Sequence, residues 1–205
     1  MLYFFKFIKS NDGKFRIYHL FTYYNNLKNI SMTNNIIENV LNLLSSYSIE
    51  TTTNVYAKYG TFSDLVPKIN NVYVTYLPDD NMNKVTETAK KLTIEGYTVI
   101  PHLPARTIEN KEQLERYIKV LSEECGCSKI LVIGGGGKQA GEITSSIEIL
   151  ETDLLSKYNF KEVGLAGHPE GNPDIKQKDL DRAIIEKNNF SKKTDFKMYL
   201  ATQVF

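Results

Sequence analysis

The sequence predicts an α/β protein built on a parallel sheet. Segments with strand periodicity and segments with helix periodicity alternate about six times from residue 32 onward. Such alternation indicates parallel strands joined by right-handed crossovers. The polar residues that end successive strands recur at a growing interval, from 25 residues between Glu50 and Thr75 to 36 between Gly167 and Gln203.

This interval favours a barrel. A (β/α)8 TIM-type barrel of about 250 residues has about 31 residues per unit, and the 205 residues of this chain hold about six such units. The predicted fold is therefore a (β/α)8 TIM-type barrel with about six βα units present. An open, doubly wound sheet also accepts six strands, so the interval alone leaves both architectures open.

Six segments rich in β-branched and aromatic residues predict the strands, each bounded by turn-forming residues. Their last residues are polar or glycine, which marks one edge of the sheet. The predicted strands are 47–53, 71–77, 97–103, 129–135, 161–167 and 197–205.

Amphipathic segments before and between these strands predict helices. Gly96 stands in the helix-stop position of the helix that precedes the third strand. In the segment after the first strand, Ser63 can cap a short helix, which Pro67 limits. The predicted helices are 33–46, 62–69, 82–96, 110–126, 141–158 and 175–189.

Composition indicates one sizeable globular domain. The chain is 41% hydrophobic and 24% charged, and its formal net charge is +1. A near-neutral chain lacks the clustered basic excess of a nucleic-acid-binding protein. Cys125 and Cys127 are too few for a disulfide framework and lack the second ligand pair of a zinc site, so we expect packing residues and no metal.

The first 31 residues differ from the rest of the chain. They are aromatic and basic, without a regular period, and Lys6 interrupts an apolar run at 2–8 that is too short to span a bilayer. No small-residue cleavage site follows. We expect 1–31 to be a poorly ordered N-terminal extension, a translated upstream segment in preference to a membrane-surface tail, and 32–205 to be the partial barrel, with no membrane partner.

The ends of the predicted strands carry most of the chemistry-bearing residues. Taken singly, each has an ordinary role: Glu50 can cap a helix or pair with a lysine, His102 can be a structural histidine, and Gln203 can bond to backbone. Parallel strands bring their carboxyl ends to one edge, where ligands bind in both architectures. Convergence on that edge favours a functional site.

Two loops at this edge have unusual composition. The run "GGGG" at 134–137 follows a strand and precedes a helix, so its N–H groups can hold a phosphate, or its backbone can lie against a flat ring. It matches neither G-x-G-x-x-G nor a Walker loop. The run "AGHPEGNPDI" at 166–175 contains Pro169 and Pro173, which predict a rigid turn.

Read in order, the strand-end motifs "SIETT", "VYVTY", "PHLPAR", "ILVIGGGG", "AGHPEGNPD" and "YLATQ" resemble those of the methylenetetrahydrofolate reductase family. The resemblance covers residues 47–205. It implies a flavin-containing (β/α)8 barrel that passes a hydride from NADH or NADPH to FAD, and then to the methylene carbon of 5,10-methylenetetrahydrofolate. It thus implies a cytoplasmic enzyme of one-carbon metabolism and methionine biosynthesis, which we expect to be a homo-oligomer with a small-molecule folate substrate.

The resemblance also implies residue roles. Glu50 matches the general acid that helps to open the imidazolidine ring of the folate, and partial burial would raise its pKa toward that role. Thr75 and Tyr76 match the strand end beside the flavin and the nicotinamide, and His102 matches a flavin contact. Gln203 matches the glutamine that hydrogen-bonds the pterin.

The remaining matches concern the cofactor. His168 and Asn172 fall where the family contacts the adenosine half of FAD, and Asp179 matches the acid that holds the FAD ribose. The expected cofactor-binding set is Thr75, Tyr76, His102, Gly134, Gly135, Gly136, His168, Asn172 and Asp179.

Two departures from the family pattern favour a second hypothesis. Family members commonly carry Arg-Gly-Asp at the end of the fourth strand, where this chain has only glycines, and the last two βα units are expected to be missing. The second hypothesis is a non-catalytic folate- or flavin-binding barrel or an inactive fragment.

Overall fold

The computed structural model describes residues 47–62, 69–136, 138–173 and 175–202, together with the backbone of two short segments near the amino terminus. These segments, β1 (Ile8–Lys9) and β2 (Phe15–Arg16), pair antiparallel. The rest of the predicted extension 1–31 and the predicted helix 33–46 lie outside the described residues. The predicted domain division therefore stays a prediction.

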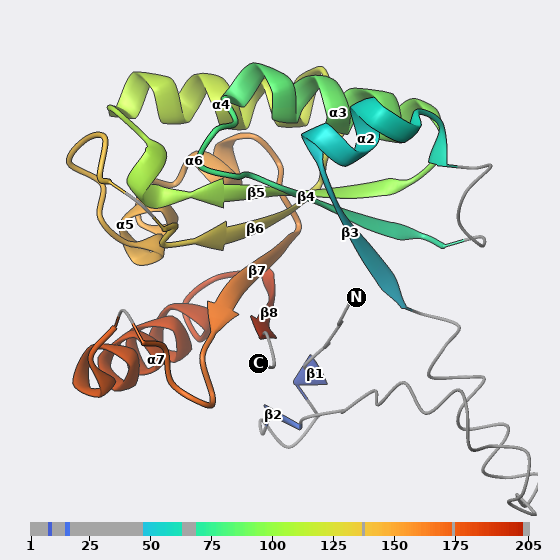
Figure 1. Ribbon diagram of the computed structural model, residues 1–205. Helices are drawn as coiled ribbons and strands as arrows, with labels where there is room; N and C mark the ends of the chain where they lie inside the picture. Colours follow the sequence, from blue (N-terminus) through green and yellow to red (C-terminus); the bar gives the residue numbers. More distant parts are fainter. Residues whose placement is uncertain are drawn as a thin grey trace, which may run out of the picture.

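Six further strands form one parallel sheet (Figure 1). They coincide with the six predicted segments, except that β5 extends one residue beyond 97–103 to Pro104 and that residues 203–205 lie outside the described residues. The strands are β3 (Ser48–Thr52), β4 (Asn71–Thr75), β5 (Thr98–Pro104), β6 (Lys129–Ile133), β7 (Glu162–Gly167) and β8 (Lys197–Thr202).

The order of the strands across the sheet is the same as their order along the chain, from β3 to β8. A doubly wound sheet reverses its strand order at a switch point, and this sheet has no reversal. The doubly wound alternative is therefore wrong. Each crossover instead places the next strand beside the previous one, always on the same side, and the result is a parallel half-barrel.

Contacts across the sheet show how strongly it curves. The hydroxyl groups of Tyr73 on β4 and Tyr199 on β8 lie 2.8 Å apart. These strands are four positions apart, which is about 19 Å across a flat sheet. Two tyrosine side chains standing up from a flat sheet do not meet over that span, so the contact requires a concave inner face.

Helices follow the strands on the outer, convex side (Figure 1). Besides a short 3-10 helix, η3 (Ala105–Thr107), the described helices are α2 (Thr53–Tyr59), α3 (Met82–Ile94), α4 (Lys111–Glu123), α5 (Ser146–Leu150), α6 (Leu154–Lys157) and α7 (Gln177–Ser191).

The core lies between the sheet and these helices. Side chains alternate between the two faces of a strand. Thus Val72, Val74 and Leu103 point outward and pack with Leu114 and Ile118 of α4 in the hydrophobic core. The alternate residues of the same strands line the inner face of the half-barrel.

Two helix predictions differ from the structure. The segment 141–158 forms α5 and α6 instead of one helix, because Ser145 caps a helix beginning at Ser146 and Asp153 has a φ of 58°. A left-handed residue cannot continue an α-helix. Helix α2 was not predicted, although the Thr52 side chain caps it by accepting a hydrogen bond from the Val55 N–H at 3.1 Å.

Cys125 and Cys127 are free, buried residues just beyond the end of α4, so the prediction of packing residues is confirmed. The Cys125 thiol donates a hydrogen bond to the backbone oxygen of Thr86 at 3.3 Å. The predicted helix 62–69 lies largely outside the described residues. No helix in the described part of the chain is both long and apolar enough to cross a membrane.

Candidate functional site

The carboxyl ends of β3, β4 and β5 bring three of the predicted site residues together. Glu50 of β3 pairs in register with Tyr73 of β4, and Thr75 ends β4 two residues later. The Thr75 hydroxyl donates a hydrogen bond to the Glu50 carboxylate. The charge of this carboxylate also acts on the imidazole of His102 on β5. Glu50, Thr75 and His102 therefore share the inner face.

Glu50 differs from its sequence prediction in one respect. Partial burial was expected to raise the pKa of its carboxyl group, but the side chain is exposed. Strand β3 is the edge of the described sheet, so a neighbouring strand covers Glu50 on the β4 side alone. The local feature that orients the carboxylate is its hydrogen bond with Thr75.

His102 is the most unusual residue of the inner face. It is 6% exposed, and neither Nδ1 nor Nε2 of its ring has a hydrogen-bond partner among the described residues. Burial lowers the pKa of His102, and the Glu50 carboxylate opposes this shift. The ring is therefore neutral at physiological pH, with one N–H donor and one acceptor nitrogen unused. A buried polar group in this state costs free energy unless a ligand satisfies it.

Either nitrogen can pair with the edge of a flavin or pterin ring, because such an edge presents both donors and acceptors. The unpartnered nitrogens of His102 are thus compatible with the flavin that the family resemblance implies. The backbone of His102 is held from the helix side, where the Tyr117 hydroxyl donates to the His102 carbonyl oxygen at 3.1 Å.

Tyr76 does not join this group. It packs against the hydrophobic core, and its ring meets that of Tyr117 edge-on with centroids 6.4 Å apart. Burial raises the pKa of Tyr76. Tyr76 follows Thr75 at the point where strand alternation turns a side chain to the opposite face. The structure thus separates the two residues that were predicted to lie together beside the cofactor.

The glycine run follows β6 at the same edge of the sheet. Gly134 accepts a hydrogen bond from the Arg106 N–H at 3.0 Å. Gly135 has a φ of +83°, and a Cβ atom there would lie 2.9 Å from Pro104 Cβ, so local packing explains this glycine. A Cβ at Gly134 or Gly136 would meet nothing within 4 Å. These two positions leave open space at the edge.

The loop after β7 carries a second polar group. His168 is half-buried, and burial together with the ammonium of Lys187 lowers its pKa. Lys187 of α7 donates a hydrogen bond to the Ala166 carbonyl oxygen at 2.7 Å, which holds its positive charge at the carboxyl end of β7. Asn172 lies in the same loop and forms an isolated bridge with Ile175.

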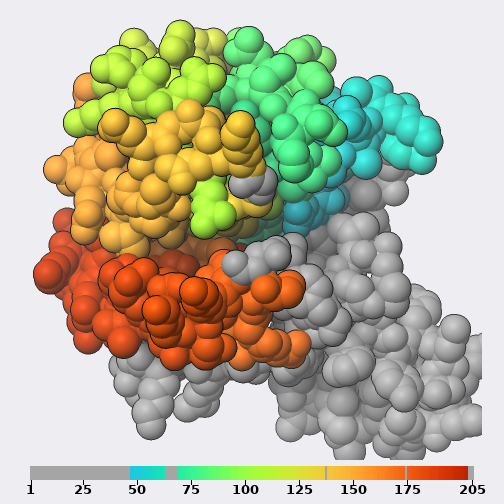
Figure 2. Space-filling view, turned by 60° about the vertical axis from the view of Figure 1, so that its left-hand side comes forward, coloured from blue at the N-terminus to red at the C-terminus, as the bar shows by residue number. Residues whose placement is uncertain are grey.

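Asp179 lies in the first turn of α7 and forms an ion pair with Arg182 at 3.1 Å. Helix α7 forms one flank of the molecule (Figure 2, orange to red), and its side chains Ile184 and Ile185 are exposed. His168 therefore lies in the loop that follows β7, and Asp179 lies in α7, the helix to which that loop leads. Gln203 lies outside the described residues, so its predicted role stays a prediction.

Four residues of this region were missed in the sequence. Lys187 shares a helix face with Leu180, Ala183 and Phe190, and a lysine in such a half-buried stripe is a recognisable signal. Tyr73, Gly164 and Tyr199 occupy inward positions of their strands. Their importance depends on the curvature of the sheet, which has no local signal in the sequence.

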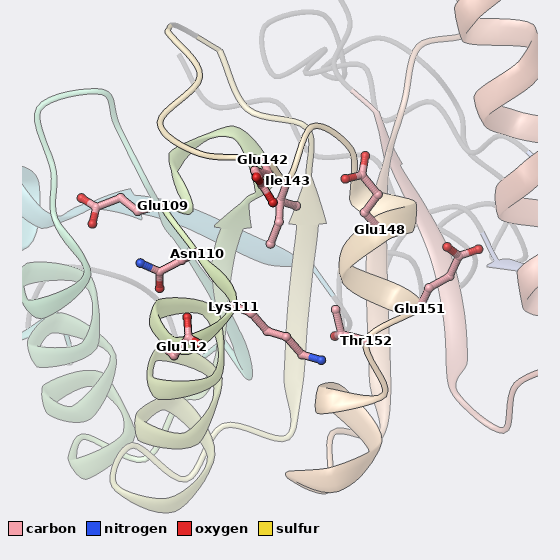
Figure 3. A pocket seen from close by; sticks show the side chains of 9 residues that line it. All are labelled: Glu109, Asn110, Lys111, Glu112, Glu142, Ile143, Glu148, Glu151 and Thr152. Carbon is pink, nitrogen blue, oxygen red and sulfur yellow. The ribbon is translucent and has the colours of Figure 1, made fainter.

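A separate depression of about 670 Å³ lies between the amino-terminal end of α4 and α5 (Figure 3). Its polar lining is mostly acidic, with Glu109, Glu142, Glu148 and Glu151 around it. Such a lining repels phosphate groups. None of the predicted site residues lines the depression, and among the described residues no cluster of His, Cys, Asp and Glu is able to hold a metal ion.

No family model matches this chain.

Proposed function

We propose that this chain is a flavin-dependent reductase of 5,10-methylenetetrahydrofolate, which uses NADH or NADPH and acts in the cytoplasm. When bound, FAD would accept a hydride from the nicotinamide and deliver it to the methylene carbon of the folate, giving 5-methyltetrahydrofolate. The six-stranded half-barrel belongs, in this proposal, to a (β/α)8 TIM-type barrel. Strand order and curvature support it, since both are those of a barrel segment.

The observation that carries this proposal is the buried, unpartnered imidazole of His102 at the ligand-binding edge of a parallel sheet. A structural histidine in a core normally finds a hydrogen-bond partner. A ligand ring in contact with His102 would satisfy one of its two ring nitrogens. This arrangement suits the edge of a fused nitrogen heterocycle.

The other residues have complementary tasks in this proposal. Glu50 supplies the carboxyl group that acts on the folate amine, and the Thr75 hydroxyl orients it. Lys187 and His168 lie at the end of β7, where a cation favours the diphosphate of FAD. Gly134 and Gly136 leave room for the backbone to approach the cofactor, and Gln203 orients the pterin.

The first experiment is reconstitution of the full chain with FAD. We expect a yellow protein whose absorbance near the flavin maximum is bleached by NADH or NADPH under anaerobic conditions. Glu50→Gln should leave this bleaching unchanged and abolish folate turnover, because the carboxyl group acts on the folate and not on the nicotinamide. His102→Gln should weaken FAD binding.

The matched control is Glu109→Gln, which removes a carboxylate from the acidic depression and not from the inner face. It should change neither half-reaction. A protein that does not bind FAD contradicts the proposal. Binding of folate or flavin without oxidation of NADH or NADPH supports instead the non-catalytic barrel, which the glycines in place of Arg-Gly-Asp favour.

A further inference from the structure

Two tyrosine hydroxyl groups meet across the inner face of the half-barrel. Tyr73 of β4 and Tyr199 of β8 are 126 residues apart in the sequence, and their oxygens lie 2.8 Å apart. Tyr199 is buried and Tyr73 is partly buried. Their hydrogen bond joins two strands that are not neighbours in the sheet, so it spans the inner face itself.

Gly164 makes this bridge possible. It lies on β7, directly beside Tyr199 in the register of the sheet. A Cβ atom at Gly164 would lie 2.6 Å from Cζ and 2.7 Å from the hydroxyl oxygen of Tyr199. The Tyr199 ring therefore lies low over β7, in space that any other residue at 164 would fill, and from there its hydroxyl reaches Tyr73.

Tyr73 in turn packs against His102. The two rings meet edge-on, with centroids 6.3 Å apart and an interplanar angle of 74°. Since neither nitrogen of His102 is hydrogen-bonded to a described residue, no polar contact there fixes the plane of its ring. The ring of Tyr73, tethered at its hydroxyl, is the aromatic neighbour that orients it.

We propose that Tyr73 and Tyr199 are positioning residues, whose hydroxyl bridge over Gly164 holds the His102 imidazole in the orientation that receives the ligand. The part of this inference that concerns the ligand rests on the proposed flavin function. The part that concerns the orientation of His102 is a property of the chain alone, so the two can be tested separately.

The bridge is suited to this task because both groups keep their protons. Burial raises the pKa of Tyr73 to about 12 and that of Tyr199 further. Both hydroxyl groups are therefore neutral at physiological pH. One donates to the other, and the accepting hydroxyl keeps its own proton for a further hydrogen bond.

The first test observes His102 directly. The chain has three histidines, so the ring-nitrogen NMR signals of His102 can be assigned with a His102→Gln variant. We expect Tyr73→Phe and Tyr199→Phe to shift these signals and to change the ratio of the two neutral tautomers. Gly164→Ala should have the same effect with both hydroxyls present, because the added methyl displaces Tyr199.

The control is Tyr158→Phe, which removes a tyrosine hydroxyl that donates to Glu115 at 2.9 Å in the helix layer. It should leave the His102 signals unchanged. If Tyr73→Phe and Tyr199→Phe also leave them unchanged in folded protein, the bridge does not position His102 and the inference is wrong.

The second test measures FAD binding by quenching of flavin fluorescence. Each single variant should bind FAD about three- to tenfold more weakly, which corresponds to the loss of one neutral hydrogen bond. The double variant should bind no more weakly than either single one, since both changes break the same bridge. Additive losses, or losses equal to those of Tyr158→Phe, contradict the inference. A wild-type chain that fails to bind FAD contradicts the proposed function alone, and the NMR result then decides the inference.

Discussion

The outer and inner faces of the sheet are built from adjacent residues of the same strands, yet they differ in how their side chains are satisfied. On β5, Leu103 points outward and is fully buried among apolar side chains. His102, one residue earlier, points inward and is buried with two unpartnered nitrogens. Burial on the outer face is favourable, whereas on the inner face it leaves a polar ring without a hydrogen-bond partner, which is unfavourable.

The two ends of the inner face, at the amino and carboxyl ends of the strands, also differ from each other. At its amino-terminal end the carboxylate of Glu162 is buried between two ammonium groups, 3.4 Å from Lys129 and 3.1 Å from Lys197. At its carboxyl-terminal end His102 has no such partner. The buried carboxylate at one end of the inner face is paired, whereas the buried imidazole at the other end, where parallel sheets bind their ligands, has no partner. Three substitutions test this difference.

The largest effect is expected on the outer face. Leu103→Ala removes a fully buried side chain and leaves a cavity between β5 and the helices, which should lower the free energy of unfolding by about 3 kcal/mol. Urea titration followed by circular dichroism measures this loss. Ile94→Ala is the control, because Ile94 is 77% exposed and its truncation should change little. Equal effects of the two substitutions would mean that the outer face is not the stabilising core.

A smaller loss is expected at the amino-terminal end of the inner face. Glu162→Gln leaves Lys129 and Lys197 without their carboxylate, which should cost about 2 kcal/mol because Glu162 is buried while both lysines keep contact with water. The same titration at low and high salt measures it.

Glu87→Gln breaks an exposed pair with Lys91 within α3 and provides the comparison for that experiment. Its effect should be hard to detect. A neutral result at both positions would show that the ion cluster around Glu162 does not stabilise the inner face.

The outer face was largely predictable from the sequence, because its signals are local. Runs of β-branched residues mark β4 and β6, and Gly96, with a φ of 95°, ends α3 where a helix stop was predicted. The break between α5 and α6 was not predictable in the same way. It depends on Asp153 adopting a left-handed conformation, which the apolar period of 141–158 does not reveal.

The inner face was only partly predictable. Parallel strands place their ends together whatever their curvature, so the meeting of Glu50, Thr75 and His102 followed from alternation alone. The contact between Tyr73 and Tyr199 did not, because it depends on how far the whole sheet bends between residues 126 positions apart. Motif matching also placed Tyr76 beside Thr75, although strand geometry sends adjacent side chains to opposite faces.

The smallest expected change has the opposite sign to the other two. His102→Leu replaces a buried, unpartnered ring by an apolar side chain, so it should raise the free energy of unfolding at pH 7 by about 1 kcal/mol while weakening ligand binding. A loss of stability on this substitution would mean that His102 is a structural residue.

The pH dependence sharpens this last comparison. Burial lowers the pKa of His102 in the folded chain. Below pH 6.5, the ordinary pKa of a histidine, the unfolded chain therefore binds a proton at His102 that the folded chain does not bind. Stability therefore falls as the pH drops from about 6.5 toward 5, and His102→Leu should flatten this decline. His168→Gln should flatten it less, because His168 is half-buried and its pKa is lowered by burial and by Lys187 together. Thermal unfolding between pH 5 and 8 measures both slopes, and equal slopes for wild type and His102→Leu would show that the inner face does not hold a neutral histidine away from water.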